Sequence, residues 1–202
     1  MRKKILITGG GGDIAKAIKK NCKNFEIDSP GRMELDVSDQ KSIDQFIRDK
    51  KYDILINNAG YISPAALADH ELDKEIKTID VNLMGVIRVS LAVHKKNPDG
   101  LIIINIGSSA GTKPRGTWGA YCASKAALIM LTACWADEGI SAYCLSPGRT
   151  ATKMRHDLFG EEDNSTLMSA DDFAKVVLAT IEGKHQPGVN LDINLNNVGS
   201  YI

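Results

Sequence analysis

The stretch Lys4-Ile5-Leu6-Ile7-Thr8-Gly9-Gly10-Gly11-Gly12-Asp13-Ile14 places four consecutive glycines between an apolar run and a helical pattern. The run over residues 4–8 predicts a buried strand, and residues 14–22 follow it with the spacing of a helix. Glycines let a backbone approach a phosphate closely, and the N-terminus of the next helix offers free N–H donors. A flexible turn has the same composition, so this stretch alone is a weak sign of a nucleotide site. A P-loop is excluded, because Ala17 rather than Ser or Thr follows Lys16.

Outward from this stretch, short apolar runs alternate with helical patterns along the chain. Such alternation predicts an α/β fold, a Rossmann-type doubly wound parallel sheet of about seven strands. The expected strands are residues 4–8, 25–28, 33–37, 53–56, 101–106, 140–145 and 189–193. The expected helices are residues 14–22, 39–50, 71–95, 118–137 and 171–182. The linker over residues 29–31 is too short for a full crossover helix, which leaves a tight excursion or a missing helix.

Length and composition indicate one ordinary globular domain over residues 1–202, with a short polar segment at about 153–170 as the variable substrate segment and a candidate lid. Basic and acidic residues both number 25, which argues against nucleic acid as an obligate partner. The apolar run after Lys4 is too short for a signal peptide or a membrane span, so the expected location is cytoplasmic, without membrane contact. The four cysteines form no CxxC pair and the histidines are scattered, so no metal site is expected.

Polar residues follow the later strands at positions where a parallel sheet binds ligands. Asn57-Asn58-Ala59-Gly60 ends the fourth expected strand, and Ser108 lies just past the fifth. Tyr121 and Lys125 are four residues apart, so they share one face of the expected helix. A free Tyr has a pKa of about 10, and a nearby ammonium is expected to lower it toward the range of a useful acid or base. Standing alone, the pair would be interpreted as an exposed Tyr–Lys pair on a helix.

Taken in order, these motifs resemble those of the classical short-chain dehydrogenase/reductase family over about residues 4–152. The motifs that carry the resemblance are Thr8-Gly9 with its glycine cluster, Asp36-Val37, Asn57-Asn58-Ala59-Gly60, Val81-Asn82, Asn105-Ile106-Gly107-Ser108, Tyr121-Cys122-Ala123-Ser124-Lys125 and Pro147-Gly148-Arg149-Thr150-Ala151-Thr152. The interval of 13 residues between Ser108 and Tyr121 also fits that family. The resemblance implies hydride transfer between a nicotinamide cofactor and a small carbonyl or alcohol substrate.

The resemblance also implies roles for individual residues. It implies a catalytic tetrad of Asn82, Ser108, Tyr121 and Lys125, in which Asn82 positions a water, Ser108 holds the substrate oxygen, Tyr121 transfers a proton, and Lys125 tunes Tyr121 and bridges the ribose hydroxyls. The implied cofactor contacts are Thr8, Gly9, Gly12, Asp13 and Ile14 at the pyrophosphate, Asp36 and Val37 at the adenine, Asn58, Ala59 and Gly60 on the adenosine side, and Pro147, Gly148 and Thr152 at the nicotinamide.

Four features depart from the family pattern. Asp13 and Ala15 stand where the family usually has glycines, and Gly107 replaces the first of two serines. The chain is also short in the second crossover and after Thr152, where the family covers its substrate. A carboxylate at Asp13 can cap the helix but must point away from the phosphates. The substrate is therefore the part that the resemblance determines least.

Cofactor choice depends on Asp28-Ser29-Pro30-Gly31-Arg32, at the end of the second expected strand. An acidic residue there favours NAD, and a basic residue favours NADP by binding the 2′-phosphate. Because Phe25 and Ile27 alternate as the buried face, Asp28 points the other way, Ser29 follows the strand end, and Arg32 turns back over the crevice. Ser29 and Arg32 are therefore expected to contact the cofactor, and NADP(H) is favoured over NAD(H).

Alternatives and further expectations concern the substrate and the assembly. A non-catalytic NAD(P)-binding sensor or scaffold, and epimerase-like chemistry on a nucleotide sugar, remain open alternatives. Arg115 and Arg149 lie near the expected catalytic mouth with Trp118, so one arginine faces an anionic or polar substrate group, or else both are solvated. The long helices over residues 71–95 and 118–137 commonly form a two-fold interface in the resembling family, which implies a homodimer or homotetramer.

Overall fold

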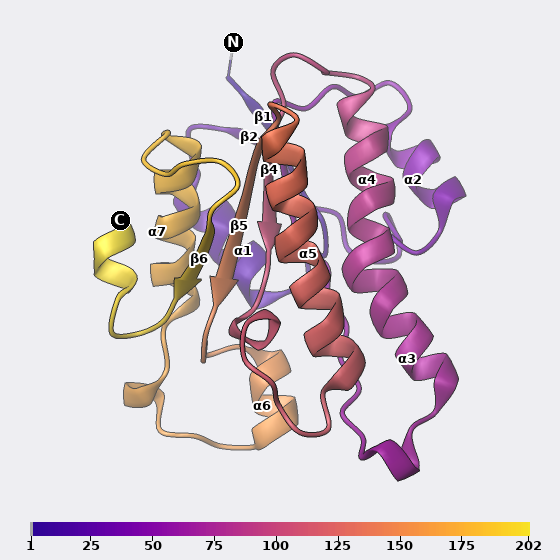
Figure 1. The fold of residues 1–202 in the computed structure, drawn as a ribbon. Helices are drawn as coiled ribbons and strands as arrows, with labels where there is room; N and C mark the ends of the chain where they lie inside the picture. Colours follow the sequence, from indigo (N-terminus) through magenta and orange to yellow (C-terminus); the bar gives the residue numbers. More distant parts are fainter. Residues whose placement is uncertain (1) are drawn as a thin grey trace.

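The computed structural model describes residues 2–202 and shows one domain built on a six-stranded parallel sheet (Figure 1). The strand order is β2-β1-β3-β4-β5-β6, and every neighbouring pair is parallel. The strands are β1 (Lys4–Ile7), β2 (Glu26–Asp28), β3 (Ile54–Asn57), β4 (Ile102–Ile106), β5 (Ser141–Pro147) and β6 (Asn190–Ile193). The Rossmann-type α/β fold expected from the sequence is confirmed, with six strands.

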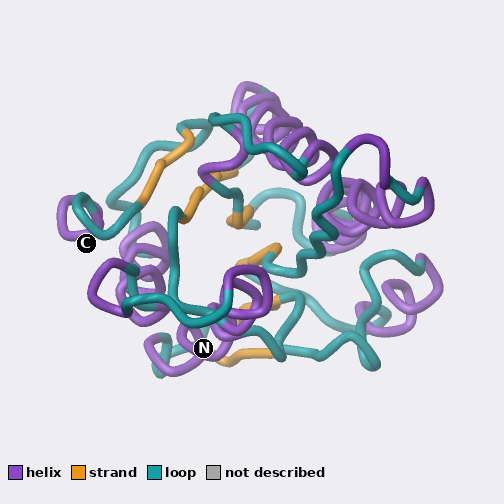
Figure 2. Tube along the Cα trace, turned by 90° about the horizontal axis from the view of Figure 1, so that it is seen from below, coloured by secondary structure: helices purple, strands orange, loops and turns teal. Residues whose placement is uncertain are grey.

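Helices cover both faces of the sheet, as the view from below shows (Figure 2). They are α1 (Asp13–Asn21), α2 (Gln40–Ile47), α3 (Leu72–Ile79), α4 (Gly85–His94), α5 (Gly119–Asp137), α6 (Lys153–Phe159) and α7 (Ala170–Ile181). Helices α1 and α7 pack together on one face, whereas α2, α4 and α5 lie on the other.

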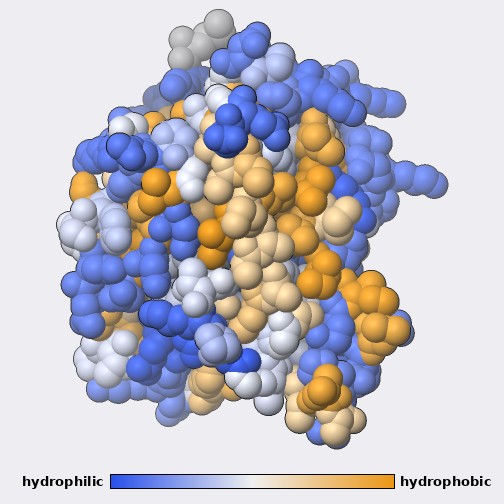
Figure 3. All heavy atoms as spheres, in the orientation of Figure 1, coloured by the Kyte–Doolittle hydropathy of each residue, from blue (hydrophilic) through white to orange (hydrophobic). Residues whose placement is uncertain are grey.

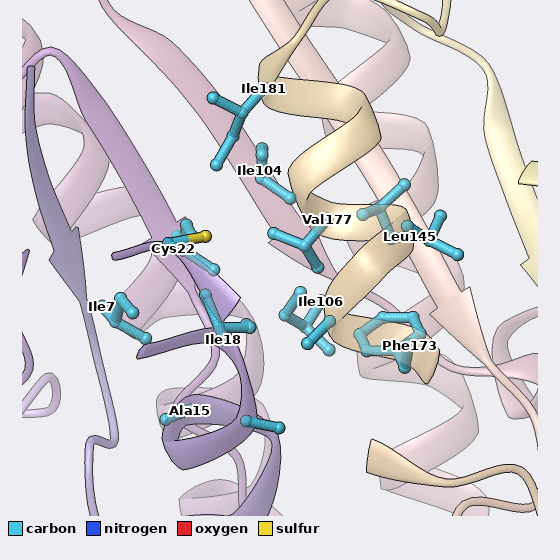
Figure 4. Close-up of a cluster of buried hydrophobic side chains, with 14 of the residues drawn as sticks. Ile7, Ala15, Ile18, Cys22, Ile104, Ile106, Leu145, Phe173, Val177 and Ile181 are labelled. Atoms are coloured by element: carbon cyan, nitrogen blue, oxygen red, sulfur yellow. The ribbon is translucent and has the colours of Figure 1, made fainter. Parts of the chain in front are cut away.

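Successive side chains of each strand point to opposite faces of the sheet, which divides the core into two layers. Ile5 and Ile7 of β1 face α1 and α7, and Figure 4 shows side chains of these two helices and of the strands packed together in this cluster. Leu6 lies between them in sequence and faces the opposite cluster, with Val89 of α4. Burial on both faces explains why these strands are continuous apolar runs. The carboxyl ends of β1 and β3 lie side by side with their connections on opposite sides, which opens a crevice at that edge.

Residues 33–37 do not form a strand, so this expectation is wrong. The segment is a series of turns in which the backbone N–H groups of Glu34 and Leu35 both donate to the carbonyl of Gly31. A parallel crossover needs a dozen or more residues, and the linker after β2 is much shorter. Leu35 and Val37 are nevertheless buried, and this alternating burial imitates a strand in the sequence.

Two other expected segments differ in the structure. The single helix expected over residues 71–95 is interrupted by a π-helical turn, Asp80–Met84, between α3 and α4. The segment expected to be irregular after Thr152 begins with α6, whose first turn is capped by the Thr152 hydroxyl accepting from the N–H of Arg155. By length and composition alone, α5 is the one described helix that could cross a membrane, and less than a quarter of its most apolar stretch is buried.

Candidate active site

A cleft of about 730 Å³ opens at the carboxyl ends of the strands, where the expected ligand site lies. It brings together most of the residues that the sequence selected. These are Gly9, Gly12, Asp13, Ile14, Arg32, Asp36, Val37, Asn58, Ala59, Gly60, Ser108, Tyr121, Lys125, Pro147, Gly148 and Thr152. A cavity of this size is within the range of small-molecule and cofactor sites.

Three selected residues, Thr8, Ser29 and Asn82, lie behind the cleft surface. The Thr8 hydroxyl accepts from the backbone N–H groups of Asn58 and Ala59, both at 3.0 Å, and so ties β1 to the loop after β3. Ser29 packs against Gly10, where an added Cβ would lie 2.1 Å from the Ser29 carbonyl oxygen. These contacts shape the glycine loop from behind.

The glycine loop leaves the start of α1 open toward the cleft. Gly9 has a φ of +67°, and a Cβ there would lie 2.8 Å from the Cα of Ala59, so a glycine is required. Gly12 precedes α1 and offers no side chain to bond the first N–H groups of the helix. These donors and the positive end of the helix form a site suited to a phosphate.

Asp13 links the glycine loop to the start of α6. It does not cap α1; instead its Oδ2 accepts from the backbone N–H of Lys153 at 2.6 Å, at the start of α6. Its Oδ1 lies 3.7 Å from the Lys16 ammonium. The carboxylate thus stands on the cleft wall between α1 and α6, with its charge partly balanced.

Ser108, Tyr121 and Lys125 converge at the inner end of the cleft. Ser108 follows β4 and is largely buried, and its hydroxyl accepts from the N–H of Ala110 at 3.2 Å. Tyr121 lies in the first turn of α5. Lys125 lies one turn later, where its Nζ donates to the carbonyl of Ile106 at 2.8 Å and lies 5.8 Å from the centre of the Tyr121 ring. The expected proximity of these three side chains is present in the structure.

The electrostatics of this cluster differ from the expectation in one respect. Burial lowers the pKa of Lys125 to about 8. Burial also raises the pKa of Tyr121 above its ordinary value, although the Ser108 hydroxyl and the charge of Arg115 act in the opposite direction. The expected lowering by Lys125 is therefore wrong for the protein alone, because desolvation dominates and the ammonium is directed at the Ile106 carbonyl.

Asn82 is fully buried in the π-helical turn between α3 and α4. Its Oδ1 accepts from the N–H of Tyr61 at 2.8 Å, and its Nδ2 donates to the Tyr61 carbonyl at 2.8 Å and to the Ser124 hydroxyl at 3.1 Å. It thereby joins the loop after β3 to the helix that carries Tyr121. Its role in relaying a proton stays a prediction.

The part of the cleft around Trp118 and Tyr121 contains residues that the sequence analysis missed. Tyr61, Lys77 and Phe159 line the cleft together with Trp118. The Trp118 ring lies edge-on to Tyr121 at 5.6 Å between centroids and 5.9 Å from Phe159. The only local signal was the capping residue Thr152, which marks the start of α6.

A family model described as short chain dehydrogenase matches residues 15–163, well over half of the chain. The chain belongs to the short-chain dehydrogenase family. The matched region of this short-chain dehydrogenase includes Ser108, Tyr121 and Lys125 but begins after the glycine loop.

Individual relatives agree with the family. The bifunctional ribulose 5-phosphate reductase/CDP-ribitol pyrophosphorylase Bcs1 of Haemophilus influenzae is 27% identical over 98% of this chain and 44% of its own length. The short-chain dehydrogenase described here spans about half the length or less of several curated relatives that it matches.

Solved structures share the fold. A small-chain dehydrogenase in complex with NADPH superposes with a TM-score of 0.84 at 20% identity, covering 100% of this chain and 99% of the other. A 3-ketoacyl-(acyl-carrier-protein) reductase from Brucella melitensis complexed with NADH gives a TM-score of 0.81 at 22% identity, covering 95% and 96% of the two chains. At these identities the likeness shows the fold.

Proposed function

We propose that the protein is an NAD(P)-dependent oxidoreductase that interconverts a small carbonyl compound and the corresponding alcohol. The observation that carries this proposal is the convergence of Ser108, Tyr121 and Lys125 in the cleft that begins at the glycine loop. Family membership supports it, and so does the relative whose name includes a ketose-phosphate reductase activity.

The described residues fit a nicotinamide dinucleotide along the length of the cleft. The uncapped start of α1 suits the pyrophosphate, and Asp36 and Val37 line the end expected for adenine. Pro147, Gly148 and Thr152 line the end next to Tyr121, where the nicotinamide would lie. When bound, a nicotinamide supplies or accepts the hydride at the carbonyl carbon.

The side chains at the inner end would handle the proton and the substrate oxygen. In the reducing direction Tyr121 donates its phenolic proton to the carbonyl oxygen, while Ser108 hydrogen-bonds the same oxygen and orients it. In this proposal Lys125 holds the ribose hydroxyls, and Asn82 supports a water that restores the proton. Buried titratable side chains whose pKa values are shifted, such as Tyr121 and Lys125, are typical of a catalytic centre.

The deciding experiment is cofactor oxidation with a panel of ketones and aldehydes, using both NADPH and NADH. Turnover of any member that disappears in the Tyr121→Phe variant supports the proposal. Tight cofactor binding without turnover of any carbonyl compound would favour the sensor alternative, and sugar-nucleotide inversion without net cofactor oxidation would favour the epimerase-like alternative. The cytoplasmic location and the absence of nucleic acid and membrane partners stay predictions.

We further propose a preference for NADP(H), which rests on where Asp28 and Arg32 lie. The Asp28 carboxylate accepts from the Tyr52 hydroxyl at 2.6 Å and lies near Lys4 and Lys50, away from the cleft. Arg32 lines the cleft, and its Nε donates to Asp36 at 2.9 Å. No residue in the described part of the chain bonds its terminal nitrogens, which suits them to a 2′-phosphate.

Replacing Arg32 with Ala is expected to weaken NADPH binding roughly tenfold or more while changing NADH binding little, because charge-assisted hydrogen bonds are among the stronger ones. The measurement is the dissociation constant of each cofactor by titration calorimetry. Asp28→Asn is the matched control and should leave the NADPH/NADH ratio unchanged. If Asp28→Asn changes the NADPH/NADH ratio of dissociation constants and Arg32→Ala does not, Asp28 at the end of β2 determines the cofactor preference and the assignment to Arg32 is wrong.

We propose a homodimer or homotetramer formed through the exposed apolar faces of α4 and α5. Met130 of α5 is 66% exposed and Leu91 of α4 is 52% exposed. Figure 3 shows apolar residues gathered over these two helices. Contiguous apolar surface of this kind marks an association site more often than a solvated face.

Met130→Glu is expected to shift the assembly toward the monomer, because a carboxylate would be buried without a partner in the interface. Light scattering at micromolar concentration measures the mass, to be compared with 21.9 kDa for one chain. Met33→Glu is the control, since Met33 is 98% exposed and lies on neither of these helices. A wild-type protein of monomer mass at every concentration contradicts the proposal.

A further inference from the structure

The substrate end of the cleft carries positive charge that neighbouring carboxylates do not balance. Most basic side chains on the cleft wall are paired. The pairs are Lys16 with Asp13, Arg32 with Asp36, Arg149 and Arg155 with Glu162, and Lys153 with Asp157. Lys125 donates to a backbone carbonyl instead. Within residues 2–202, Lys77 and Arg115 are the cleft-lining cations that have neither kind of partner.

Both cations lie over aromatic rings that also line the cleft. The Lys77 ammonium is 4.5 Å from the centre of the Tyr61 ring, and the Arg115 guanidinium is 5.4 Å from the Trp118 ring. The Trp118 ring in turn contacts Tyr121 edge-on. The Trp118 ring therefore lies between Arg115 and Tyr121. The charge of Arg115 still acts to lower the pKa of Tyr121, against the larger effect of burial.

The loop that carries Arg115 is held in a strained shape. Thr117 has a φ of +67° and is the only described non-glycine residue with a positive φ. This conformation is unfavourable for a β-branched residue. The backbone N–H of Ala65 donates to the Thr117 carbonyl at 3.0 Å and fastens the loop to the segment after Tyr61. Backbone strain that the surroundings maintain is concentrated at ligand sites, where it fixes the direction of side chains.

We propose that Lys77 and Arg115 bind an anionic group on the substrate, so that the enzyme acts on small carbonyl compounds bearing a carboxylate or a phosphate. This inference rests on the oxidoreductase function proposed above and specifies its substrate class. The planar guanidinium presents parallel donors that match either anion, and the ammonium adds a second point charge. Arg149 is not the recognising arginine, because its terminal nitrogen Nη2 already donates to Glu162 at 2.9 Å and to Thr166 at 3.3 Å.

The kinetic test compares carbonyl compounds that differ in one anionic group: acetoacetate with methyl acetoacetate, and dihydroxyacetone phosphate with dihydroxyacetone. We expect a higher kcat/KM for the anionic member of at least one pair. Arg115→Met should reduce that value roughly 10- to 100-fold and change the neutral member less than about threefold. Arg115→Lys should restore part of the loss, and Lys77→Met should act in the same direction as Arg115→Met.

Lys113→Met is the matched control, because Lys113 lies on the same loop, is 69% exposed and is nearest to Asp192 at 3.6 Å, off the cleft. It should leave both members of each pair unchanged. Equal losses for anionic and neutral members in Arg115→Met would overturn the inference. Turnover of neutral compounds that depends on Tyr121 but shows no preference for the anion would overturn it while leaving the oxidoreductase function intact.

A binding measurement decides the inference independently of turnover. Protein with Tyr121→Phe and Trp135→Phe, loaded with NADP⁺, retains Trp118 as its one tryptophan reporter and cannot complete the reaction. Dihydroxyacetone phosphate or acetoacetate should change its fluorescence, with a dissociation constant that Arg115→Met raises roughly 10- to 100-fold. If neither anion binds better than its neutral partner, the inference is wrong. Anion binding with no turnover by the wild type would instead reject only the proposed function.

Discussion

Replacing Tyr121 with Phe is expected to slow turnover by about 10²–10⁴-fold, the range typical of general acid–base catalysis. The substitution removes only the phenolic oxygen, so the ring should keep its edge-on contact with Trp118 at 5.6 Å and the fold should be unchanged. Cofactor affinity should change little, because the glycine loop and the start of α1, which suit the pyrophosphate, are left intact. Steady-state kinetics and cofactor titration measure the two quantities separately.

The direction of the Tyr121 pKa adds a dependence on pH. Because burial keeps this pKa above its ordinary value, the phenol is protonated near neutrality and ready to donate a proton in the reducing direction. Alcohol oxidation needs the phenolate, so its rate in the wild type should rise as pH increases toward that pKa. Phe at this position should abolish the rise.

Tyr143→Phe is the control for this prediction. It removes the same oxygen from a largely buried tyrosine of β5 that packs with the α1–α7 core cluster, outside the cleft. Activity close to the wild type in this variant would show that loss of a phenol does not by itself disturb the enzyme. Near wild-type activity in Tyr121→Phe, with any accepted substrate, would contradict the assignment of the proton-transfer residue.

Local motifs predicted that Ser108, Tyr121 and Lys125 lie close together, because the fold brings the end of β4 and the first turns of α5 to one edge of the sheet. Ser108 follows β4, and Tyr121 and Lys125 are one helical turn apart, so short-range spacing and strand order together determine their proximity. The segment after β2, at the edge of the sheet, was harder to predict from the sequence. Leu35 and Val37 show the alternating burial of a strand, but turns at Gly31 produce it, and only the length of the linker after β2 distinguishes the two cases.

The substrate end depends on contacts between segments distant in sequence. The loop around Thr117 is placed by the N–H of Ala65, and the neighbouring Tyr61 is placed by Asn82. No periodicity or capping pattern encodes these bonds. The sequence therefore gave no reason to choose between Arg115 and Arg149 as the arginine that faces the substrate. Only the structure shows that Arg149 is paired with Glu162.

Replacing Lys125 with Met is expected to abolish most turnover and yet to stabilise the protein without cofactor. Burial lowers the Lys125 pKa from 10.5 to about 8. That lowering means that the buried, charged Lys125 destabilises the folded state by roughly 3 kcal/mol near neutral pH. The lost hydrogen bond to the Ile106 carbonyl offsets about 1 kcal/mol of the gain. The free energy of unfolding should therefore increase by about 1–2 kcal/mol, measured by urea denaturation near pH 7.

The sign of the pH dependence separates this explanation from a general benefit of an apolar side chain. As pH rises above about 8, the native Lys125 loses its proton while the unfolded chain keeps it until about 10.5, so wild-type stability should increase over that interval. The advantage of the Lys125→Met variant should shrink accordingly. Lys113→Met, at an exposed site, should change stability by less than about 0.5 kcal/mol at either pH. The explanation is wrong if the Lys125→Met variant is less stable than the wild type near pH 7, or if its advantage in stability grows with pH. Either result would show that the buried Lys125 ammonium does not destabilise the folded protein.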